Sequence, residues 1–355
     1  RAVVLAGFAA GYATAFLWGV YGLRDGTVTF GVMTAFLQLV GKVQRPALDL
    51  SRLLPSFINA LTAVERLMEL EELPERLVIV GGGYIGLEFA SMYARFGSKV
   101  TILQNGSVFL PKEDRDMAEA VENVLKSYGV SVITGAGLKE IKEGTAVYTK
   151  NGEEDTLDGD AILLATGRGP NTEGLHAERA GVELTKRGAV VTDKHLRTTA
   201  ENIWAAGDVC GNLQFTYISL DDSRIILSDM QGDGSRTTEN RGAFAYSVFM
   251  EPSFSRAGLS EKEAADKGLN YRVVRMNTDM IPKAKVLRKT TGMLKAVIDK
   301  DSGKIFGAAL FCPESYEIIN MVKLAMDHDL DYTVLRDFIY THPTMSEGLN
   351  DLFAL

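Results

Sequence analysis

One stretch in the first third of the chain limits the possible folds more than any other part, and it reads LVIVGGGYIGLEFASMYARFGSKVTILQ over residues 77–104. An apolar run at 77–80 predicts a β-strand, a helix-compatible run follows at 87–96, and a second strand is predicted at 99–103. Between the first strand and the helix, glycines recur in the spacing G-x-G-x-x-G. Strand, glycine turn, helix and strand in this order predict the first βαβ unit of a dinucleotide-binding fold.

The three glycines of this turn have separate predicted tasks. Gly81 permits a tight turn after the strand, Gly83 lets the backbone approach a pyrophosphate, and Gly86 lets the helix pack closely on the strand. The first N–H groups of the helix then face the phosphates. Together with Ile85 and Gln104, these glycines are the predicted contacts for NAD or NADP.

The residue that ends the second strand bears on the choice between the two dinucleotides. An acidic residue there favours NAD, and a nearby arginine favours NADP. This chain has Gln104 followed by Asn105 at that point. The sequence therefore leaves both NADH and NADPH open.

The composition excludes several other classes of function. A net charge of −8 and a pI near 5.2 argue against a nucleic-acid-binding protein, and 355 residues predict two or three domains. The two cysteines, Cys210 and Cys312, form no CxxC or CxxxxC pair, which favours a reducing compartment. The four histidines show no metal-ligand spacing, so we predict no metal site.

The first 75 residues differ in character from the rest. Residues 2–23 carry no charge, residues 24–26 form a short polar turn, and a second uncharged run covers 27–41. These lengths predict a helical hairpin that spans the inner membrane, with residues 1–41 in contact with lipid and both ends cytoplasmic. The alternative is a buried helical hairpin in a soluble domain.

This N-terminal segment resembles the last two transmembrane helices of an ABC exporter. Four stretches carry the resemblance: GTVTFG at 26–31, AFLQLV at 35–40, RPAL at 45–48 and AVERLMEL at 63–70. The chain contains no GxxxxGKS or GxxxxGKT phosphate loop. The resemblance thus implies a membrane transport fragment without its ATPase.

The middle of the chain contains a predicted meander and two motifs that follow predicted strands. Residues 138–157 alternate in polarity around two glycine turns, which predicts an antiparallel meander. Predicted strands at 161–165 and 203–206 lead into the motifs ATGRGPNT and WAAGDV. With GGGYIGLE before them and THPTMSEGLNDLF at 341–353 after them, these motifs resemble the flavin-dependent pyridine nucleotide–disulfide oxidoreductases. The resemblance covers nearly all of residues 76–355.

The resemblance implies cofactors, partners and a branch of the family. It implies NAD(P)H and FAD as cofactors, a small-molecule electron acceptor, and a homodimer formed through residues 243–355. FTYISLDDSRI at 215–225 and the closing stretch point to a bacterial branch. Members of that branch are proposed to reduce reactive chlorine products, hypothiocyanite or metal ions.

The resemblance also implies roles for single residues near the cofactors. Tyr84 would be a flap over the nicotinamide pocket, and Glu88 would lie beside the nicotinamide, paired with a lysine of the flavin domain. Gly167 and Arg168 would lie at the turn beside the cofactor, and Asp208 would bind the ribityl chain of the flavin. The plainer alternatives are a packed Tyr84, a solvated Glu88 and a capping Asp208.

The resemblance implies an acid/base pair near the C-terminus. His342 would serve the active-site thiol of the partner subunit, and Glu347 would orient its imidazole. An imidazole titrates near neutral pH, and a carboxylate partner fixes its tautomer. Alone, a histidine before a proline is read as a structural turn residue.

Two parts of the family pattern are missing from the sequence. It contains neither a preceding glycine fingerprint for FAD nor a CxxxxC pair, so the adenosine half of FAD lacks its expected pocket and no thiolate is placed to carry electrons. We therefore expect weak NAD(P)H binding and little or no turnover. The alternatives are a membrane transport fragment with a soluble passenger, or a folded but inactive relic.

These inferences together predict the fold class and its division into domains. We expect a Rossmann-like α/β domain with a meander at 76–210, a returning segment of the flavin domain at 211–242, and an α+β dimerisation domain at 243–355. An α-helical transmembrane-type hairpin, 1–75, precedes them. The junction at 71–76 fits both the exporter-like segment before it and the reductase-like segment after it. This predicts a fusion, or an artefact of sequence assembly.

Overall fold

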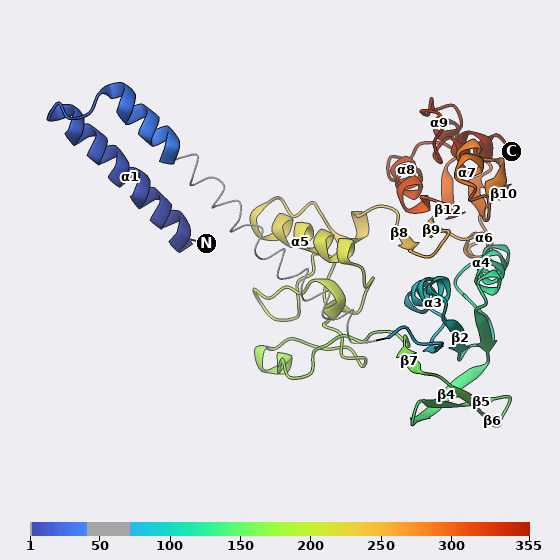
Figure 1. The fold of residues 1–355 in the computed structure, drawn as a ribbon. Coiled ribbons are helices and arrows are strands. Elements are labelled where there is room, and N and C mark those ends of the chain that lie inside the picture. Colours follow the sequence, from blue (N-terminus) through green and yellow to red (C-terminus); the bar gives the residue numbers. More distant parts are fainter. Residues whose placement is uncertain (1, 41–71) are drawn as a thin grey trace. The chain divides into compact units, whose positions relative to one another are not determined.

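The computed structural model describes residues 2–40 and 72–355 (Figure 1). The chain divides into two units, Arg1–Leu73 and Pro74–Leu355. In the first unit, α1 (Ala2–Arg24) is followed by a turn and a second helical stretch at 30–40. Trp18 packs on Phe36 with ring centroids 5.1 Å apart. The predicted helical hairpin is therefore present in the part that is described.

The membrane assignment of this hairpin is not supported. Within residues 2–40 and 72–355, no helix combines the length and apolar character needed to cross a membrane. Crossing a hydrocarbon core about 30 Å thick requires roughly 20 predominantly apolar residues in one helix. The exporter-like stretches at 45–48 and 63–70, and the first residue of the junction at 71–76, lie outside the described residues.

A four-stranded parallel sheet begins the second unit, with strand order β3-β2-β1-β7. The four apolar residues of β1 are buried, and the helix after it begins at Tyr84, three residues earlier than the sequence predicted. This arrangement confirms the predicted βαβ unit. The elements are β1 (Arg76–Val80), α3 (Tyr84–Phe96), β2 (Lys99–Gln104), α4 (Arg115–Ser127), β3 (Ser131–Thr134) and β7 (Ala161–Leu164).

An antiparallel meander lies between β3 and β7, as the alternating pattern predicted. Its two turns place Gly144 and Gly152 at φ +84° and +86°, a region that glycine adopts without steric cost. The strands are β4 (Ala136–Lys142), β5 (Thr145–Lys150) and β6 (Glu153–Asp158).

The next segment, 165–244, contains little regular structure beyond α5 (Thr216–Gln231) and short 3₁₀ turns, including η2 (Gly207–Cys210). The strand predicted at 203–206 does not form, because the segment pairs only locally with the loop before it. Arg197 and Trp204 make an isolated bridge there. The remaining turns are η1 (Ala177–Ala180) and η3 (Thr238–Asn240).

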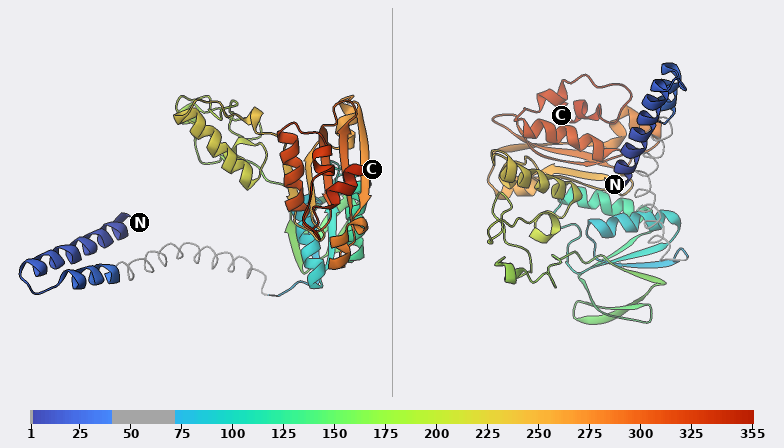
Figure 2. Two further views of the ribbon diagram at one scale, coloured as in Figure 1. Left: turned by 90° about the horizontal axis from the view of Figure 1, so that it is seen from above. Right: turned by 90° about the vertical axis from the view of Figure 1, so that its left-hand side faces the viewer.

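The C-terminal region confirms the predicted α+β architecture. Five antiparallel strands take the order β10-β11-β12-β9-β8, and α8 covers one face (Figure 2). The strands are β8 (Ala245–Val248), β9 (Phe254–Gly258), β10 (Tyr271–Asn277), β11 (Met293–Asp299) and β12 (Ile305–Phe311). The helices and turns are α6 (Glu261–Asp266), η4 (Thr278–Met280), α7 (Pro282–Leu287), α8 (Ser315–Asp327), α9 (Thr333–Arg336) and α10 (Gly348–Ala354).

The parallel sheet and the C-terminal sheet share a core, with α3 and α4 between them (Figure 2). A buried ion cluster joins the same two regions. Lys295 of β11 is 2% exposed, and its Nζ lies 2.9 Å from both Asp114 and Asp116 and 2.7 Å from Glu261. Burial alone would lower the pKa of Lys295, but the three carboxylates together raise it.

Candidate functional site

The glycine turn has the geometry that its spacing predicts. Gly81 has φ +110°, and a Cβ there would lie 2.3 Å from the carbonyl oxygen of Ala165. A Cβ at Gly86 would lie 2.1 Å from the carbonyl oxygen of Gly81, so the helix approaches the strand too closely for any larger residue. Gly83 differs, because no described atom lies within 4 Å of its Cβ position. Its open side is where a ligand can approach the backbone.

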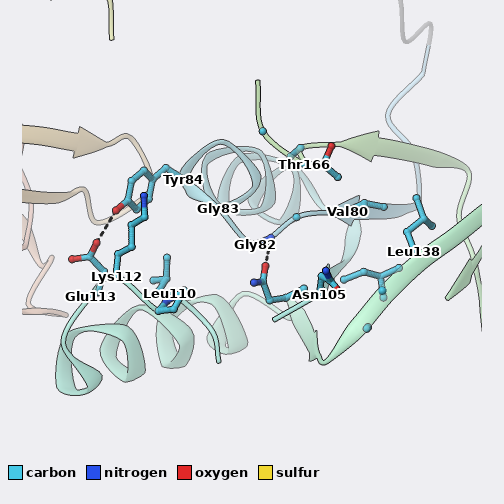
Figure 3. Close-up of a pocket in the computed structure, with 18 residues that line it drawn as sticks. Val80, Gly82, Gly83, Tyr84, Asn105, Leu110, Lys112, Glu113, Leu138 and Thr166 are labelled. Carbon is cyan, nitrogen blue, oxygen red and sulfur yellow. Dashed lines mark hydrogen bonds between the residues drawn. The ribbon is translucent and has the colours of Figure 1, made fainter. Parts of the chain in front are cut away.

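A cavity of about 720 Å³ lies beside this turn (Figure 3). The start of α3 faces it, and the first N–H groups of a helix lack intrahelical partners and carry partial positive charge. The volume lies within the range of ligand pockets. The lining residues come from the glycine turn, the end of β2, the loop before α4, the start of β4 and the turn after β7.

Gln104 lies at the predicted position but is already hydrogen-bonded. Its Oε1 accepts the N–H of Gly82 at 2.9 Å, as the dashed line in Figure 3 shows. Asn105 and Lys112 line the same cavity. Sequence reasoning missed Lys112, although the loop that connects β2 to α4 has to pass this edge of the sheet, and that connection was the available signal.

Tyr84 lines the cavity and is held by a buried acid. Its hydroxyl donates to Oε1 of Glu113 at 2.7 Å, and its ring stacks on Tyr246 with centroids 5.0 Å apart. Burial raises the pKa of both phenols, and the charge of Glu113 raises it further. Both tyrosines therefore remain protonated donors near neutral pH. Neither Glu113 nor Tyr246 was predicted from the sequence.

The other predicted cofactor residues do not all gather in this cavity. Gly167 lines it, whereas Ile85 and Glu88 are not among the lining residues. Oε1 of Glu88 accepts the N–H of Phe249 at 2.8 Å, beside a separate cavity of about 580 Å³.

Arg168 and Asp208 form an ion pair at a third cavity. Nη1 of Arg168 lies 3.0 Å from Oδ2 of Asp208, and both side chains are about half exposed. Together with Gly207, Gln214 and Thr216 they line a cavity of about 470 Å³ at the start of α5. The structure therefore brings Arg168 and Asp208 together at a cavity different from the one beside the glycine turn, although the preceding residue, Gly167, lines the latter.

The predicted C-terminal pair is present. Nδ1 of His342 lies 2.7 Å from Oε2 of Glu347, and the imidazole is 69% exposed. The other carboxylate oxygen of Glu347 accepts the N–H of Thr344 at 3.1 Å. With Nδ1 engaged by the carboxylate, Nε2 is the nitrogen available for proton transfer.

Both cysteines are buried, as expected for packed residues. Burial raises the pKa of Cys210 to about 11 and that of Cys312 to about 12. Nearby carboxylates, Asp222 and Glu314, act in the same direction. Because the thiolate is the reactive form, neither thiol is suited to redox chemistry in this state.

The geometry and two family profiles define the class of this protein. The profile described as "Pyridine nucleotide-disulphide oxidoreductase" matches residues 53–223, and the profile for the dimerisation domain of the same family matches residues 244–353. The chain therefore belongs to the pyridine nucleotide–disulfide oxidoreductase family, whose members are FAD-dependent and use NAD(P)H.

Two curated proteins of the family are similar to this chain over most of its length. The probable pyridine nucleotide-disulfide oxidoreductase RclA of Escherichia coli is 50% identical over 289 residues, covering 81% of this chain and 66% of that protein. Mercuric reductase of Staphylococcus aureus is 34% identical, covering 82% of this chain and 54% of its own length. The chain thus spans between about half and two thirds of these curated relatives.

The same likeness holds for a solved structure. The HOCl-induced flavoprotein disulfide reductase RclA from Escherichia coli superimposes with a TM-score of 0.77 at 50% identity, covering 81% of this chain and 66% of that one. Neither the profiles nor these relatives support the exporter resemblance or the transport-fragment alternative. The first family match begins at residue 53, inside the segment assigned to the exporter.

Proposed function

We propose that the chain binds NADH or NADPH in the cavity beside the glycine turn, and that it forms the dinucleotide-binding and dimerisation portions of an NAD(P)H-dependent flavoprotein oxidoreductase. The observation that carries the proposal is the open face of Gly83 at the start of α3. Gly81, Gly86 and Gln104 shape that turn, and Tyr84 and Gly167 border the same cavity. The backbone N–H groups would hold the pyrophosphate.

The cavity at the start of α5 has features that fit part of FAD. Asp208 presents a half-exposed carboxylate, which can accept hydrogen bonds from hydroxyl groups of a ribityl chain, and Arg168 balances its charge. When bound, FAD supplies the two-electron step between the nicotinamide and an acceptor. Ile85 and Glu88, both on α3, stay proposed contacts for the nicotinamide end.

The C-terminal region supports a homodimer with an acid/base pair. The family profile names this region a dimerisation domain, and His342 with Glu347 forms an exposed pair within it. In a dimer, Nε2 of His342 would exchange a proton with a group bound to the partner subunit. A disulfide or a soft metal ion is the acceptor class suggested by the names of the relatives, which are disulfide and mercuric reductases.

Dinucleotide binding is tested by titrating the full chain with NADH and with NADPH and following nicotinamide fluorescence. We expect saturable binding that Gly83→Val weakens by at least about tenfold, since the new side chain enters the space left for the ligand. Gly31→Val is the matched control, because the Cβ position of Gly31 is also uncrowded, with the Thr29 hydroxyl oxygen 3.9 Å away, and Gly31 lies in the first unit. Absence of saturable binding, or equal binding by Gly83→Val, contradicts the proposal.

A further inference from the structure

Two tyrosines from different parts of the fold share one carboxylate oxygen. The hydroxyl oxygens of Tyr84 and Tyr246 lie 2.7 and 2.5 Å from Oε1 of Glu113, and 2.9 Å from each other. Each phenol has one proton, and an ionised carboxylate is a stronger acceptor than a neutral phenol. Both protons therefore go to Glu113, which is 1% exposed in its side chain.

The same acid is held by a buried cation of the C-terminal sheet. Nη1 of Arg256 lies 3.4 Å from Oε2 of Glu113 and donates to the carbonyl oxygen of Lys112 at 2.8 Å. Arg256 belongs to β9 and Tyr246 to β8. We call Tyr84, Glu113, Tyr246 and Arg256 the Glu113 cluster. It fixes three residues that line the cavity, namely Tyr84, Lys112 and Glu113.

We propose that Glu113 is a positioning residue for dinucleotide binding, through which the C-terminal sheet holds one wall of the cavity in its binding conformation. The inference rests on the proposed function. A wall that is ordered before the ligand arrives lowers the entropic cost of binding. The carboxylate is well placed for this task, because it joins the first residue of α3 to the loop before α4 and both to β8 and β9.

The chain offers a matched control for this tether. The hydroxyl of Tyr128, at the end of α4, donates to the carbonyl oxygen of Glu251 at 3.0 Å. Tyr128 therefore also links the Rossmann-like region to the C-terminal region through a phenol, but it is not among the residues that line the cavity. Tyr128→Phe and Tyr246→Phe each remove one buried or half-buried hydroxyl and keep the ring.

The test measures hydrogen–deuterium exchange and dinucleotide affinity in the full chain and in both variants. We expect Tyr246→Phe to speed exchange in peptides covering 105–114 and to raise the Kd for NADH about three- to tenfold. We expect Tyr128→Phe to leave both unchanged. Glu113→Gln should raise the Kd further, because its amide group cannot replace an anion that receives two phenol protons and faces Arg256.

The possible failures can be told apart. If the wild-type chain binds no dinucleotide, the proposed function fails and the inference falls with it. If the wild type binds and Tyr246→Phe binds equally well, only the inference is refuted. Equal changes in Tyr246→Phe and Tyr128→Phe also refute it, since they would show a general loss of rigidity. The melting temperature of each variant identifies any that fails to fold.

Discussion

The cavity beside the glycine turn and the cavity at the start of α5 are built in different ways. The glycine turn at the centre of the first is one short segment, residues 81–86, between a packed strand and a helix, and its central backbone position, Gly83, is open. The second joins Arg168 and Asp208, forty residues apart, and its carboxylate is already paired with a cation. Contiguous sequence can therefore prepare an anion site by itself, whereas the second cavity depends on how a loop-rich segment folds.

The largest expected effect concerns the packing under the first cavity. Gly86→Val should destabilise the second unit by about 3–5 kcal/mol, because its Cβ would lie 2.1 Å from backbone that cannot move away. Gly83→Val should change stability by no more than about 0.5 kcal/mol, since its side chain enters open space. Urea denaturation of both variants measures the difference. Similar losses of stability in the two variants would contradict the different packing assigned to Gly83 and Gly86.

The next largest effect concerns the ion cluster that Lys295 forms with Asp114, Asp116 and Glu261 at the start of α4. Lys295→Met should cost about 3–5 kcal/mol at pH 7, because Asp114 would remain buried without a cation, and Asp116 and Glu261 would keep only Arg275. Burial is the largest single influence and would raise the pKa of Asp114 and Asp116. The hydrogen bonds and charge of Lys295, together with backbone N–H groups and, at Asp116, Arg275, outweigh burial and lower both pKa values.

The sign of the pH dependence follows from those lowered pKa values. The contribution of Asp114 and Asp116 is complete above their unfolded pKa, near 3.9, and is lost as the pH falls through their folded pKa values. The gap in stability between the wild type and Lys295→Met should therefore narrow below about pH 4. Denaturation curves at pH 7 and at acidic pH check this, and a gap that widens on acidification would disprove it.

The reactivity of the two cysteine thiols should differ between the native and the unfolded chain. With pKa values of about 11 and 12, Cys210 and Cys312 hold far less thiolate than ordinary cysteines. At pH 8 we expect labelling by a thiol reagent at least about a hundredfold slower in the native chain than in urea. Rapid labelling of either cysteine in the native chain would show that its segment opens readily.

The smallest expected effect concerns the second cavity. Arg168→Gln should cost about 1 kcal/mol of stability or less, since its ion pair with Asp208 is half exposed. It should also leave the Kd for NADH within about twofold of the wild type, because Arg168 does not line the first cavity. If Arg168→Gln instead abolishes NADH binding, the two cavities act as one site.

The sequence was sufficient wherever the determinants are local. The βαβ unit follows from apolar periodicity and from glycines whose close contacts and positive φ are observed, and the meander follows from its two glycine turns. The predicted pairing of His342 with Glu347, five residues apart, is also observed.

Determinants that are distant in sequence were missed. Glu113 and Tyr246 are 133 residues apart, so no local pattern connects them. Lys295 is a buried lysine on an apolar strand, which periodicity alone would assign to solvent. The hairpin of residues 2–40 was predicted in shape, but an uncharged run was not sufficient to establish a membrane span.

The shared charges of α4 and the C-terminal sheet restrict how this protein can be recombined. Glu113, Asp114 and Asp116 come from one region, and Arg256, Arg275 and Lys295, which neutralise them, come from the other. A chimera that joined the first region to the C-terminal sheet of a distant relative would need to transfer both sets together. The two regions should therefore be exchanged together in a chimera and not separately.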